Sequence, residues 1–474
     1  MHLKFILFLL FSFFFLCKVF PQTGNLSIHL AVKDSIVAQF NRSDFKAIYS
    51  FADTAFSNHI TEDQLTGFLR GLKNNGNILS SILVADSANG RKYFHTEFSI
   101  RDMLMVLKVN TRQKFTTFGF YHHPPTLLAT TPKVNSNNPG KTFLDKSIDS
   151  IAREYFWNPK ATALSIGVFK NGKQYTYHYG ETKKGTGTLP KDETQYEIGS
   201  ITKTFTATIL AHAVIENKLA LTDDIRKYLK ASFPNLEYQG VPVRLRDLAN
   251  HTARFPSLPG NFEKQIQYNP LEPYSNYTEE MLWQALHEIR LDTLPGYKFE
   301  YSNMGFAVLG KILENEYKMP YVELVKKYCA IPLKMKSITT TLQVTQKKNA
   351  AYPYSENGNA VSFSSLGVFI PAGGIYASVK DILHYIEAQI NETDPAIALT
   401  HQITQNGVGL SWGIVNFPAG YRMLQHNGST EGFQSNITIY PELKTGFIVM
   451  VNNKTDISSL VIGLNSILTP KKED

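Results

Sequence analysis

Ser200 and Lys203 form a Ser-x-x-Lys pattern in a segment where we expect a helix to begin. Side chains three positions apart on a helix share one face, so these two can touch. A serine hydroxyl is a poor nucleophile until a neighbour removes its proton, and a desolvated lysine can be neutral enough to do so. Because serine and lysine are common, this spacing alone is a weak indicator. It predicts acyl transfer only together with further motifs.

The residues around this pair, YEIGSITKTFTA at 196–207, closely resemble the nucleophile segment of class C β-lactamases and their relatives. Two more motifs follow in the order of that family. Tyr301-Ser302-Asn303 matches its Tyr-x-Asn element, and His426-Asn427-Gly428 matches the third element, which is Lys-Thr-Gly in many relatives and His-x-Gly in others. Supporting segments extend the resemblance over nearly all of residues 143–470: 245–252, 371–375, 407–413 and 432–442.

The resemblance implies a serine hydrolase in which Ser200 attacks a carbonyl and forms an acyl-enzyme, which water or another acceptor then releases. Lys203 is our first choice for the general base, with Tyr301 relaying the proton to the leaving group. The roles of Lys203 and Tyr301 could also be exchanged or shared. No metal or organic cofactor is expected.

Four further residues are expected to contact the substrate: Asn303, His426, Gly428 and Ser429. By resemblance, Asn303 binds the substrate amide. His426 should lie on a strand that lines the site and present a cationic or hydrogen-bonding side chain, with Gly428 allowing close approach. The resemblance also places the oxyanion-binding N–H groups at Ser200 and Ser429.

One segment departs from the family pattern. After His251-Thr252, relatives usually continue Ser-Gly, whereas this chain has Ala253-Arg254. We expect the arginine to alter a turn or to add a charge near the cleft, so it bears on substrate choice.

Two other sequence patterns imitate catalytic motifs. The Gly-x-Ser-x-Gly pattern at 409–413 is found in α/β-hydrolases, but that fold needs an acid and then a histidine downstream, and no histidine follows His426. Lys444-Thr445-Gly446 spells the third family motif literally, yet it follows Pro441 and precedes an apolar strand. We interpret it as a hairpin turn.

The elements that must position the site lie in residues 143–470. A helical pattern at 144–156 precedes a hairpin, in which strands at 164–169 and 175–179 flank the turn Asn171-Gly172. Helical segments follow at 222–229, 278–289, 306–316, 321–329 and 380–390, and strands at 432–440 and 446–452 close the chain. This order predicts an α+β fold, an antiparallel sheet built from both ends of the domain with helices between, as in the β-lactamase/transpeptidase-like fold.

Residues 24–129 are expected to form a separate, small α+β accessory domain, joined by a polar linker at 130–142. A helical start gives way to four strand-like runs between residues 77 and 121. This pattern resembles the cone-shaped domains of nuclear-transport-factor-2 type. His122-His123-Pro124-Pro125 is interpreted as a turn that leaves a strand rather than as a metal site.

Residues 1–22 have the basic-then-apolar order of a secretory signal peptide, so a periplasmic or secreted protein is expected. Leu16 stands before Cys17 where a lipoprotein signal has a small residue, so a lipid anchor is not expected. No later stretch is long and apolar enough to span a membrane, so the processed protein is expected to be soluble, with an uncleaved N-terminal anchor as the alternative. After processing only Cys329 is left, which predicts a packed, inert thiol.

These features predict an exported serine hydrolase that acts on an amide or ester: a D-Ala peptide, an ester or a β-lactam. The alternative is a sensor that binds β-lactams or peptidoglycan, or a binding protein that turns over poorly. The expected partner is a small-molecule or peptide substrate, with a cell-wall peptide as one candidate. The net charge of +8 comes from scattered residues without a nucleic-acid motif, so no nucleic acid is expected. The sequence leaves the oligomeric state open.

Overall fold

The computed structural model of the chain describes residues 23–86, 90–99, 102–121, 133–405 and 407–470. The chain divides into two compact units, Met1–Ala129 and Thr130–Pro470. The expected signal peptide, the His122-His123-Pro124-Pro125 turn and the first three linker residues lie outside the described residues.

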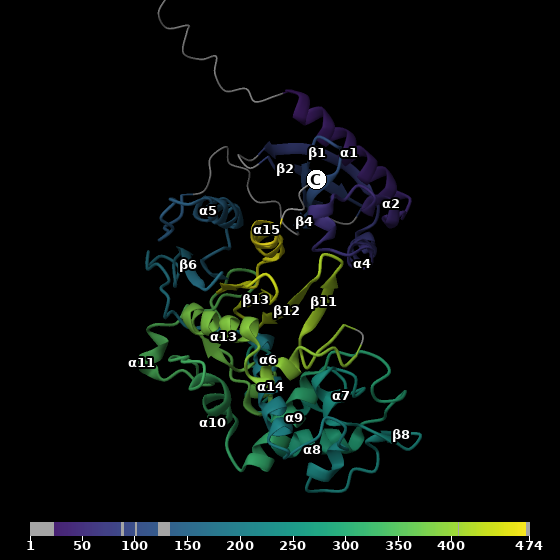
Figure 1. Cartoon of the computed structure of the whole chain (residues 1–474), viewed down its shortest axis with the longest axis vertical. Helices are drawn as coiled ribbons and strands as arrows, with labels where there is room; N and C mark the ends of the chain where they lie inside the picture. Colours follow the sequence, from purple (N-terminus) through teal and green to yellow (C-terminus); the bar gives the residue numbers. More distant parts are fainter. Residues whose placement is uncertain (1–22, 87–89, 100–101, 122–132, 406, 471–474) are drawn as a thin grey trace, which may run out of the picture. The chain divides into compact units, whose positions relative to one another are not determined.

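The first unit is an α+β unit, in which helices precede a four-stranded antiparallel sheet of order β1-β2-β3-β4 (Figure 1). Its core is rich in aromatic residues, and Phe40, Phe94 and Phe115 are fully buried. The predicted succession of helices and antiparallel strands is confirmed. The elements are α1 (Thr23–Asn41), α2 (Phe45–Tyr49), α3 (Thr54–Ser57), α4 (Glu62–Leu72), η1 (Lys73–Asn75), β1 (Ile78–Asp86), β2 (Lys92–Phe98), β3 (Asp102–Val109) and β4 (Phe115–Tyr121).

The second unit is built on a six-stranded antiparallel sheet of order β11-β12-β13-β14-β5-β6. The hairpin of its first two strands along the chain joins the sheet beside its last strand, because β5 pairs with β14. This confirms the predicted sheet made from both ends of the domain. The strands are β5 (Ala163–Lys170), β6 (Lys173–Gly180), β11 (Gly413–Phe417), β12 (Tyr421–Ser429), β13 (Gln434–Tyr440) and β14 (Thr445–Val451).

Helices cover both faces of this sheet (Figure 1). Successive side chains of a strand point to opposite faces, and along β14 Phe447 and Val449 pack with α5 (Phe143–Tyr155) and α15 (Ser458–Leu468). On the other face lies α13 (Val379–Asn391), where a Cβ added to Gly167 would fall 2.8 Å from Val379. Strand β14 is therefore buried throughout, which explains its continuous apolar sequence.

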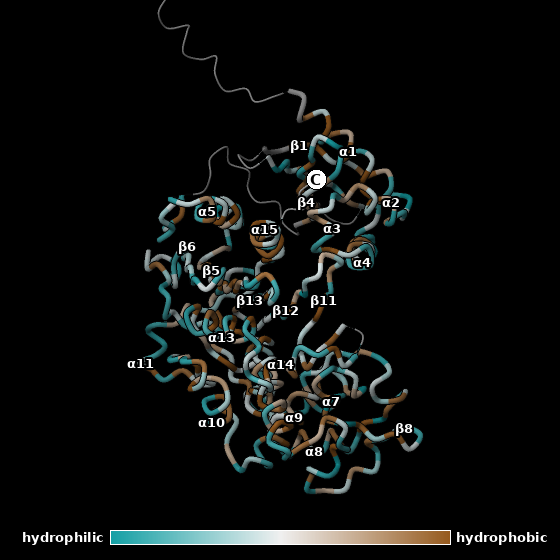
Figure 2. The backbone as a smooth tube through the Cα atoms, viewed as in Figure 1, coloured by the Kyte–Doolittle hydropathy of each residue, from teal (hydrophilic) through white to brown (hydrophobic). Residues whose placement is uncertain are grey.

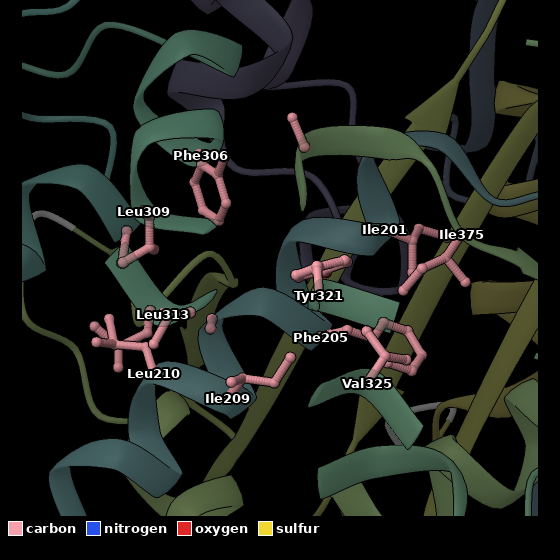
Figure 3. Packing of buried hydrophobic residues seen from close by; sticks show 14 of the residues in the cluster. Ile201, Phe205, Ile209, Leu210, Phe306, Leu309, Leu313, Tyr321, Val325 and Ile375 are labelled. Carbon is pink, nitrogen blue, oxygen red and sulfur yellow. The ribbon is translucent and has the colours of Figure 1, made fainter. Parts of the chain in front are cut away.

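The helical region between β6 and β11 surrounds α6 (Thr202–Ile215), which is apolar and buried on nearly all sides. Figure 3 shows Phe205 and Ile209 of α6 among the buried side chains of its neighbours. The other elements of this region are β7 (Tyr196–Glu197), η2 (Gly199–Ile201), η3 (Ile225–Tyr228), β8 (Glu237–Tyr238), β9 (Val241–Pro242), α7 (Leu245–Ala249), η4 (Phe262–Lys264), α8 (Glu279–Glu288), α9 (Asn303–Tyr317), α10 (Tyr321–Val325), η5 (Lys326–Ala330), α11 (Val344–Lys347), η6 (Gly367–Phe369), α12 (Ile370–Gly373), β10 (Tyr376–Ala377) and α14 (Pro395–Thr400).

Most predicted helices are present, and the exceptions have local causes. Residues 222–229 form only the 3-10 turn η3, which Asp224 caps by accepting a hydrogen bond from the Arg226 N–H. The helix predicted at 321–329 changes after Val325 into the π-helical turn η5. Figure 2 shows hydrophobic and hydrophilic residues recurring along helices such as α5 and α13, as helices with one buried face require.

Cys329 lies fully buried in the core around α6, and burial raises the pKa of its thiol. The predicted packed thiol is therefore what the structure contains. Among the described residues, no helix has both the length and the apolarity that a bilayer span requires.

Candidate active site

Ser200 lies in the short turn η2, which leads directly into α6. Gly199 precedes it with φ +51°, a left-handed conformation that suits glycine. The turn is held in place by Ile198, whose N–H donates to the Ile375 carbonyl over 3.0 Å, and by Thr202, whose hydroxyl accepts from the Ile375 N–H. The half-buried Ser200 side chain is thus fixed at the N-terminus of a buried helix, where N–H groups favour negative charge.

Lys203 is fully buried one helical turn beyond Ser200. Its Nζ lies 3.1 Å from Ser200 Oγ, 2.8 Å from Asn303 Oδ1 and 2.6 Å from the Ala372 carbonyl oxygen. No carboxylate pairs with it among the described residues. Desolvation holds the pKa of Lys203 well below its usual range. The spacing of three between Ser200 and Lys203 therefore produces the predicted contact.

Tyr301 reaches Ser200 from the loop that precedes α9. Its hydroxyl donates to Ser200 Oγ over 2.8 Å, and its ring lies 4.8 Å from Lys203 Nζ. Desolvation raises the pKa of Tyr301 to about 12. Ser302 caps α9 by accepting from the Gly305 N–H over 2.8 Å, which places Asn303 at the first position of that helix. Ser200, Lys203, Tyr301 and Asn303 thus form one hydrogen-bonded cluster.

Strand β12 approaches the nucleophile turn so closely that only glycines fit at the contact. A Cβ added to Gly199 would lie 2.6 Å from the Ser429 nitrogen, and one added to Gly428 would lie 2.0 Å from the Ile198 carbonyl oxygen. Such distances are sterically forbidden for a real side chain. The two glycines therefore bring Ser429 next to Ser200, and both serines line the same cleft.

His426 lies on β12, as predicted, but it makes no hydrogen bond to Ser200, Lys203 or Tyr301 in the described part of the chain. Its Nδ1 lies 2.7 Å from the Asn427 carbonyl oxygen, which identifies Nδ1 as the protonated ring nitrogen. Desolvation and the charge of nearby Lys203 lower the pKa of His426 to about 4. A lowered pKa favours the hydrogen-bonding character expected for this side chain over the cationic one.

His251 belongs to the site although sequence reasoning gave it no role. Its ring lies 4.3 Å from the Tyr301 ring, and its Nδ1 accepts a hydrogen bond from the Ser302 N–H over 3.0 Å. The pKa of His251 lies well below its usual range. Desolvation is the main cause, and the charge of Lys203 is a further one. A neutral His251 thus supports Tyr301 from behind.

Glu197 is a second residue that sequence reasoning did not assign. Its buried carboxylate accepts hydrogen bonds from the Ser364 N–H over 2.7 Å and from the Ser364 hydroxyl over 2.8 Å. The Tyr376 hydroxyl donates to it over 3.0 Å. Burial raises the pKa of Glu197. This carboxylate links the strand before the nucleophile to a wall of the cleft.

The cleft at Ser200 has walls of different character. Tyr274 and Phe369 form an aromatic wall with ring centroids 5.3 Å apart. Glu431 and Lys454, whose charged atoms are 3.5 Å apart, contribute charges at another wall. Ser200 and Asn303 line the cleft together with residues from five other stretches of chain: 271–274, 362–366 with Phe369, 372–373, 429–431 and Lys454. Of these stretches, 271–274 and 362–366 carry no periodicity or motif by which sequence reasoning could have found them.

Two other serines with catalytic-looking surroundings do not form a site. Ser411, in the Gly-x-Ser-x-Gly pattern, is buried, and its hydroxyl has no hydrogen-bond partner among the described residues. Ser165 lies 2.9 Å from His178 Nδ1, and His178 Nε2 lies 2.9 Å from Asp192, but Ser165 is completely buried and cannot meet a substrate.

Lys444 adopts φ +47° in the turn before β14, as predicted for the literal Lys-Thr-Gly. Within the described residues, no three His, Cys, Asp or Glu side chains cluster as metal ligands would.

Comparisons with known proteins identify the family and fold of the second unit. The family model described as Beta-lactamase matches residues 148–463. The D-alanyl-D-alanine-carboxypeptidase/endopeptidase AmpH of Escherichia coli K12 is 25% identical over 353 residues, which cover 69% of this chain and 89% of that protein. A beta-lactamase of Lysobacter lactamgenus is 25% identical over 374 residues, with 70% and 92% covered. The crystal structure of a beta-lactamase/D-alanine carboxypeptidase from Yersinia pestis, complexed with citrate, superimposes with a TM-score of 0.60 at 25% identity and covers 68% of this chain and 96% of its own.

Proposed function

Because this chain belongs to the beta-lactamase family of serine hydrolases, of carboxypeptidase or beta-lactamase type, we propose that it hydrolyses a D-alanyl peptide through an acyl-enzyme formed on Ser200. One observation carries the proposal. Ser200 lines a cleft, and its Oγ lies 3.1 Å from Lys203 Nζ and 2.8 Å from the Tyr301 hydroxyl. A nucleophile, a desolvated amine and a phenol in mutual contact are the groups that acyl transfer needs.

Lys203 is the general base in this proposal. A neutral amine has two hydrogens and one lone pair, and the hydrogens are taken by Asn303 Oδ1 and the Ala372 carbonyl oxygen. The lone pair then faces Ser200 Oγ and can accept its proton during attack on the carbonyl. Because burial lowers the pKa of Lys203, this neutral state is reached at a lower pH than in an exposed lysine.

Tyr301 passes the proton to the leaving group. With a pKa of about 12 its hydroxyl stays protonated at neutral pH, so it is a poor base and a good hydrogen-bond donor. Its hydroxyl contacts Ser200 Oγ and its ring lies 4.8 Å from Lys203 Nζ. In this proposal Tyr301 releases its own proton to the departing nitrogen or oxygen and takes up the proton that Lys203 removed from the serine. Water attacks the acyl-enzyme by the same route in reverse.

The backbone N–H groups of Ser200 and Ser429 hold the tetrahedral oxyanion in this proposal. The close approach of β12 at Gly199 and Gly428 supports it, because it brings the Ser429 nitrogen next to the nucleophile turn. Losing one such donor typically costs about 2.7–4 kcal/mol of transition-state stabilisation. Asn303 binds the substrate amide, and neutral His426 accepts or donates a hydrogen bond at the β12 side.

The peptide is preferred as substrate because the AmpH relative named above is a D-alanyl-D-alanine carboxypeptidase and endopeptidase. Turnover of a β-lactam is the second candidate, favoured by the relative that is a beta-lactamase, and an ester is chemically compatible with the same groups. A sensor that is acylated and does not turn over is the alternative from another class.

We further propose that the protein is exported to the periplasm or secreted, on the basic-then-apolar order of residues 1–22. The first unit is proposed to be an accessory domain of nuclear-transport-factor-2 type that binds a partner. Its helices followed by a four-stranded antiparallel sheet support that type. N-terminal sequencing of the protein recovered from the envelope of an expressing bacterium tests the export, and an intact Met1 contradicts it.

The experiment that tests the function compares the protein with its Ser200→Ala variant on three substrates: a peptide ending in D-Ala-D-Ala, a chromogenic cephalosporin and a nitrophenyl ester. Release of D-alanine that depends on Ser200 and exceeds turnover of the other two supports the proposal. Faster cephalosporin turnover identifies a β-lactamase instead. Stable labelling by a fluorescent penicillin without any product identifies the sensor, and equal inertness of both proteins refutes the mechanism.

A further inference from the structure

Arg254 replaces the glycine expected from the family pattern, and it adopts the left-handed φ of +61° that glycine would tolerate best. Its side chain is only 6% exposed, so the guanidinium is buried rather than free in the cleft. A long, charged residue in this conformation costs free energy and persists only where surrounding contacts compensate. Those contacts show what the arginine does.

Two carboxylates from a single loop hold the guanidinium. Its Nε and Nη2 donate to the two oxygens of Asp292 over 2.7 and 2.8 Å, a two-point contact that fixes the plane of the group. Its Nη1 lies 2.7 Å from Glu300 Oε2, an ion pair that is not aligned as a hydrogen bond. Arg254 therefore ties both ends of the 292–300 loop to one point.

This loop ends directly at Tyr301. The Glu300 N–H donates to the His251 carbonyl over 2.7 Å, and the Ser302 N–H donates to His251 Nδ1 over 3.0 Å. The backbone on both sides of Tyr301 is thus bound to the 251–254 segment. The Tyr301 hydroxyl has Ser200 as its hydrogen-bond partner among the described residues, so it does not anchor itself elsewhere.

We propose that Arg254 is a positioning residue for Tyr301, and that it acts through Glu300 to hold the phenol within hydrogen-bonding distance of Ser200. The inference rests on the proposed function only in that Tyr301 is taken to move the proton. Arg254 touches neither Ser200 nor the cleft lining, so its removal should slow the proton transfer and leave substrate binding unchanged.

The test separates these two steps. In Arg254→Met, the rate of acylation by a fluorescent penicillin should fall at least about tenfold, because proton transfer depends on ångström-scale placement. Reversible binding of the same penicillin, measured in the Ser200→Ala background, should change by less than about twofold. Arg254→Lys should recover part of the rate, since it keeps the charge and loses the two-point contact with Asp292.

Glu300→Gln and Arg226→Met complete the design. Glu300 is partly exposed, so its variant should fold even if Arg254→Met does not, and it should slow acylation in the same way. Arg226 is also held by two carboxylates, Asp224 and Glu237, and its loss should leave the acylation rate unchanged. Wild-type acylation rates in Arg254→Met or Glu300→Gln, or a parallel loss of reversible binding, would overturn the proposal.

A readout that needs no activity keeps this inference separate from the proposed function. With 3-fluorotyrosine at position 301, the ¹⁹F resonance should shift and broaden in Glu300→Gln and stay unchanged in Arg226→Met. If the wild-type protein is never acylated, the proposed function fails, and the ¹⁹F signal still decides whether Arg254 and Glu300 position Tyr301. An unchanged signal in Glu300→Gln refutes the positioning role.

Discussion

At the scale of one residue, the burial of Lys203 lowers the pKa of its amine and so favours the neutral form that a general base needs. Its amine is fully buried without a carboxylate partner, and its pKa lies well below the usual range. The active form is the neutral one, so the acylation rate should rise with pH through the lowered pKa and fall below it. Lys203→Arg should remove this rise and reduce acylation by a factor of about 10² to 10⁴, because arginine cannot act as a base. Stopped-flow acylation from pH 5 to 10 measures both effects, and an unchanged profile in the variant contradicts the role.

The same pKa predicts how stability depends on pH. The unfolded chain binds a proton at Lys203 up to pH about 10.4, whereas the folded chain releases it at the lowered pKa. Between these two values the free energy of unfolding should rise with pH, by at most about 1.4 kcal/mol per pH unit from this group. Urea unfolding of the wild type and of Lys203→Met at several pH values should show the difference, and equal slopes would refute it.

Gly428 shows at the scale of elements how a strand and a turn create the site. Gly428→Ala would place a Cβ 2.0 Å from the Ile198 carbonyl oxygen and 2.3 Å from Ser435 Oγ, so β12 and the nucleophile turn must separate. We expect a destabilisation of about 1–3 kcal/mol and a loss of acylation. Gly260→Ala is the matched control, because an added Cβ there meets nothing within 4 Å. Thermal unfolding and penicillin labelling of both variants test this, and equal behaviour would contradict it.

How far the sequence predicts the fold differs between elements. Strands with clear turn signals were predicted well: the Asn171-Gly172 hairpin is present as β5 and β6. Helices with a strong apolar period, such as α8 and α13, were predicted within two residues of their ends. The 222–229 segment was not, because side-chain caps at Asp224 favour a short turn over a continuing helix.

Part of the candidate site could be predicted, because some of its residues are marked by local spacing or by a motif. The contact of Ser200 with Lys203 follows from helical spacing, and Tyr301 and Asn303 come from a motif. The roles of His251 and Glu197 depend on hydrogen-bond partners 51 and 179 residues away in the chain, and no local pattern encodes such contacts. Arg254 was recognised as a departure, yet its pairing with Asp292 and Glu300 becomes visible only when the loops are placed.

At the scale of the whole molecule, every candidate site residue belongs to the second unit, which has its own sheet and core. A chain of residues 130–470 should therefore fold alone and be acylated within about threefold of the full-length rate, as expected for an independent domain. Circular dichroism and penicillin labelling of the shortened chain measure this. Loss of folding or of labelling would show that the first unit is needed by the second.

The most direct test of the account is the intact mass of the protein after incubation with a penicillin, followed by peptide mapping of the adduct. The wild type should gain the mass of one penicillin on the peptide that contains Ser200, and Ser200→Ala should gain none. An adduct on any other residue, or an equal adduct on both proteins, would contradict the central claim that Ser200 is the nucleophile.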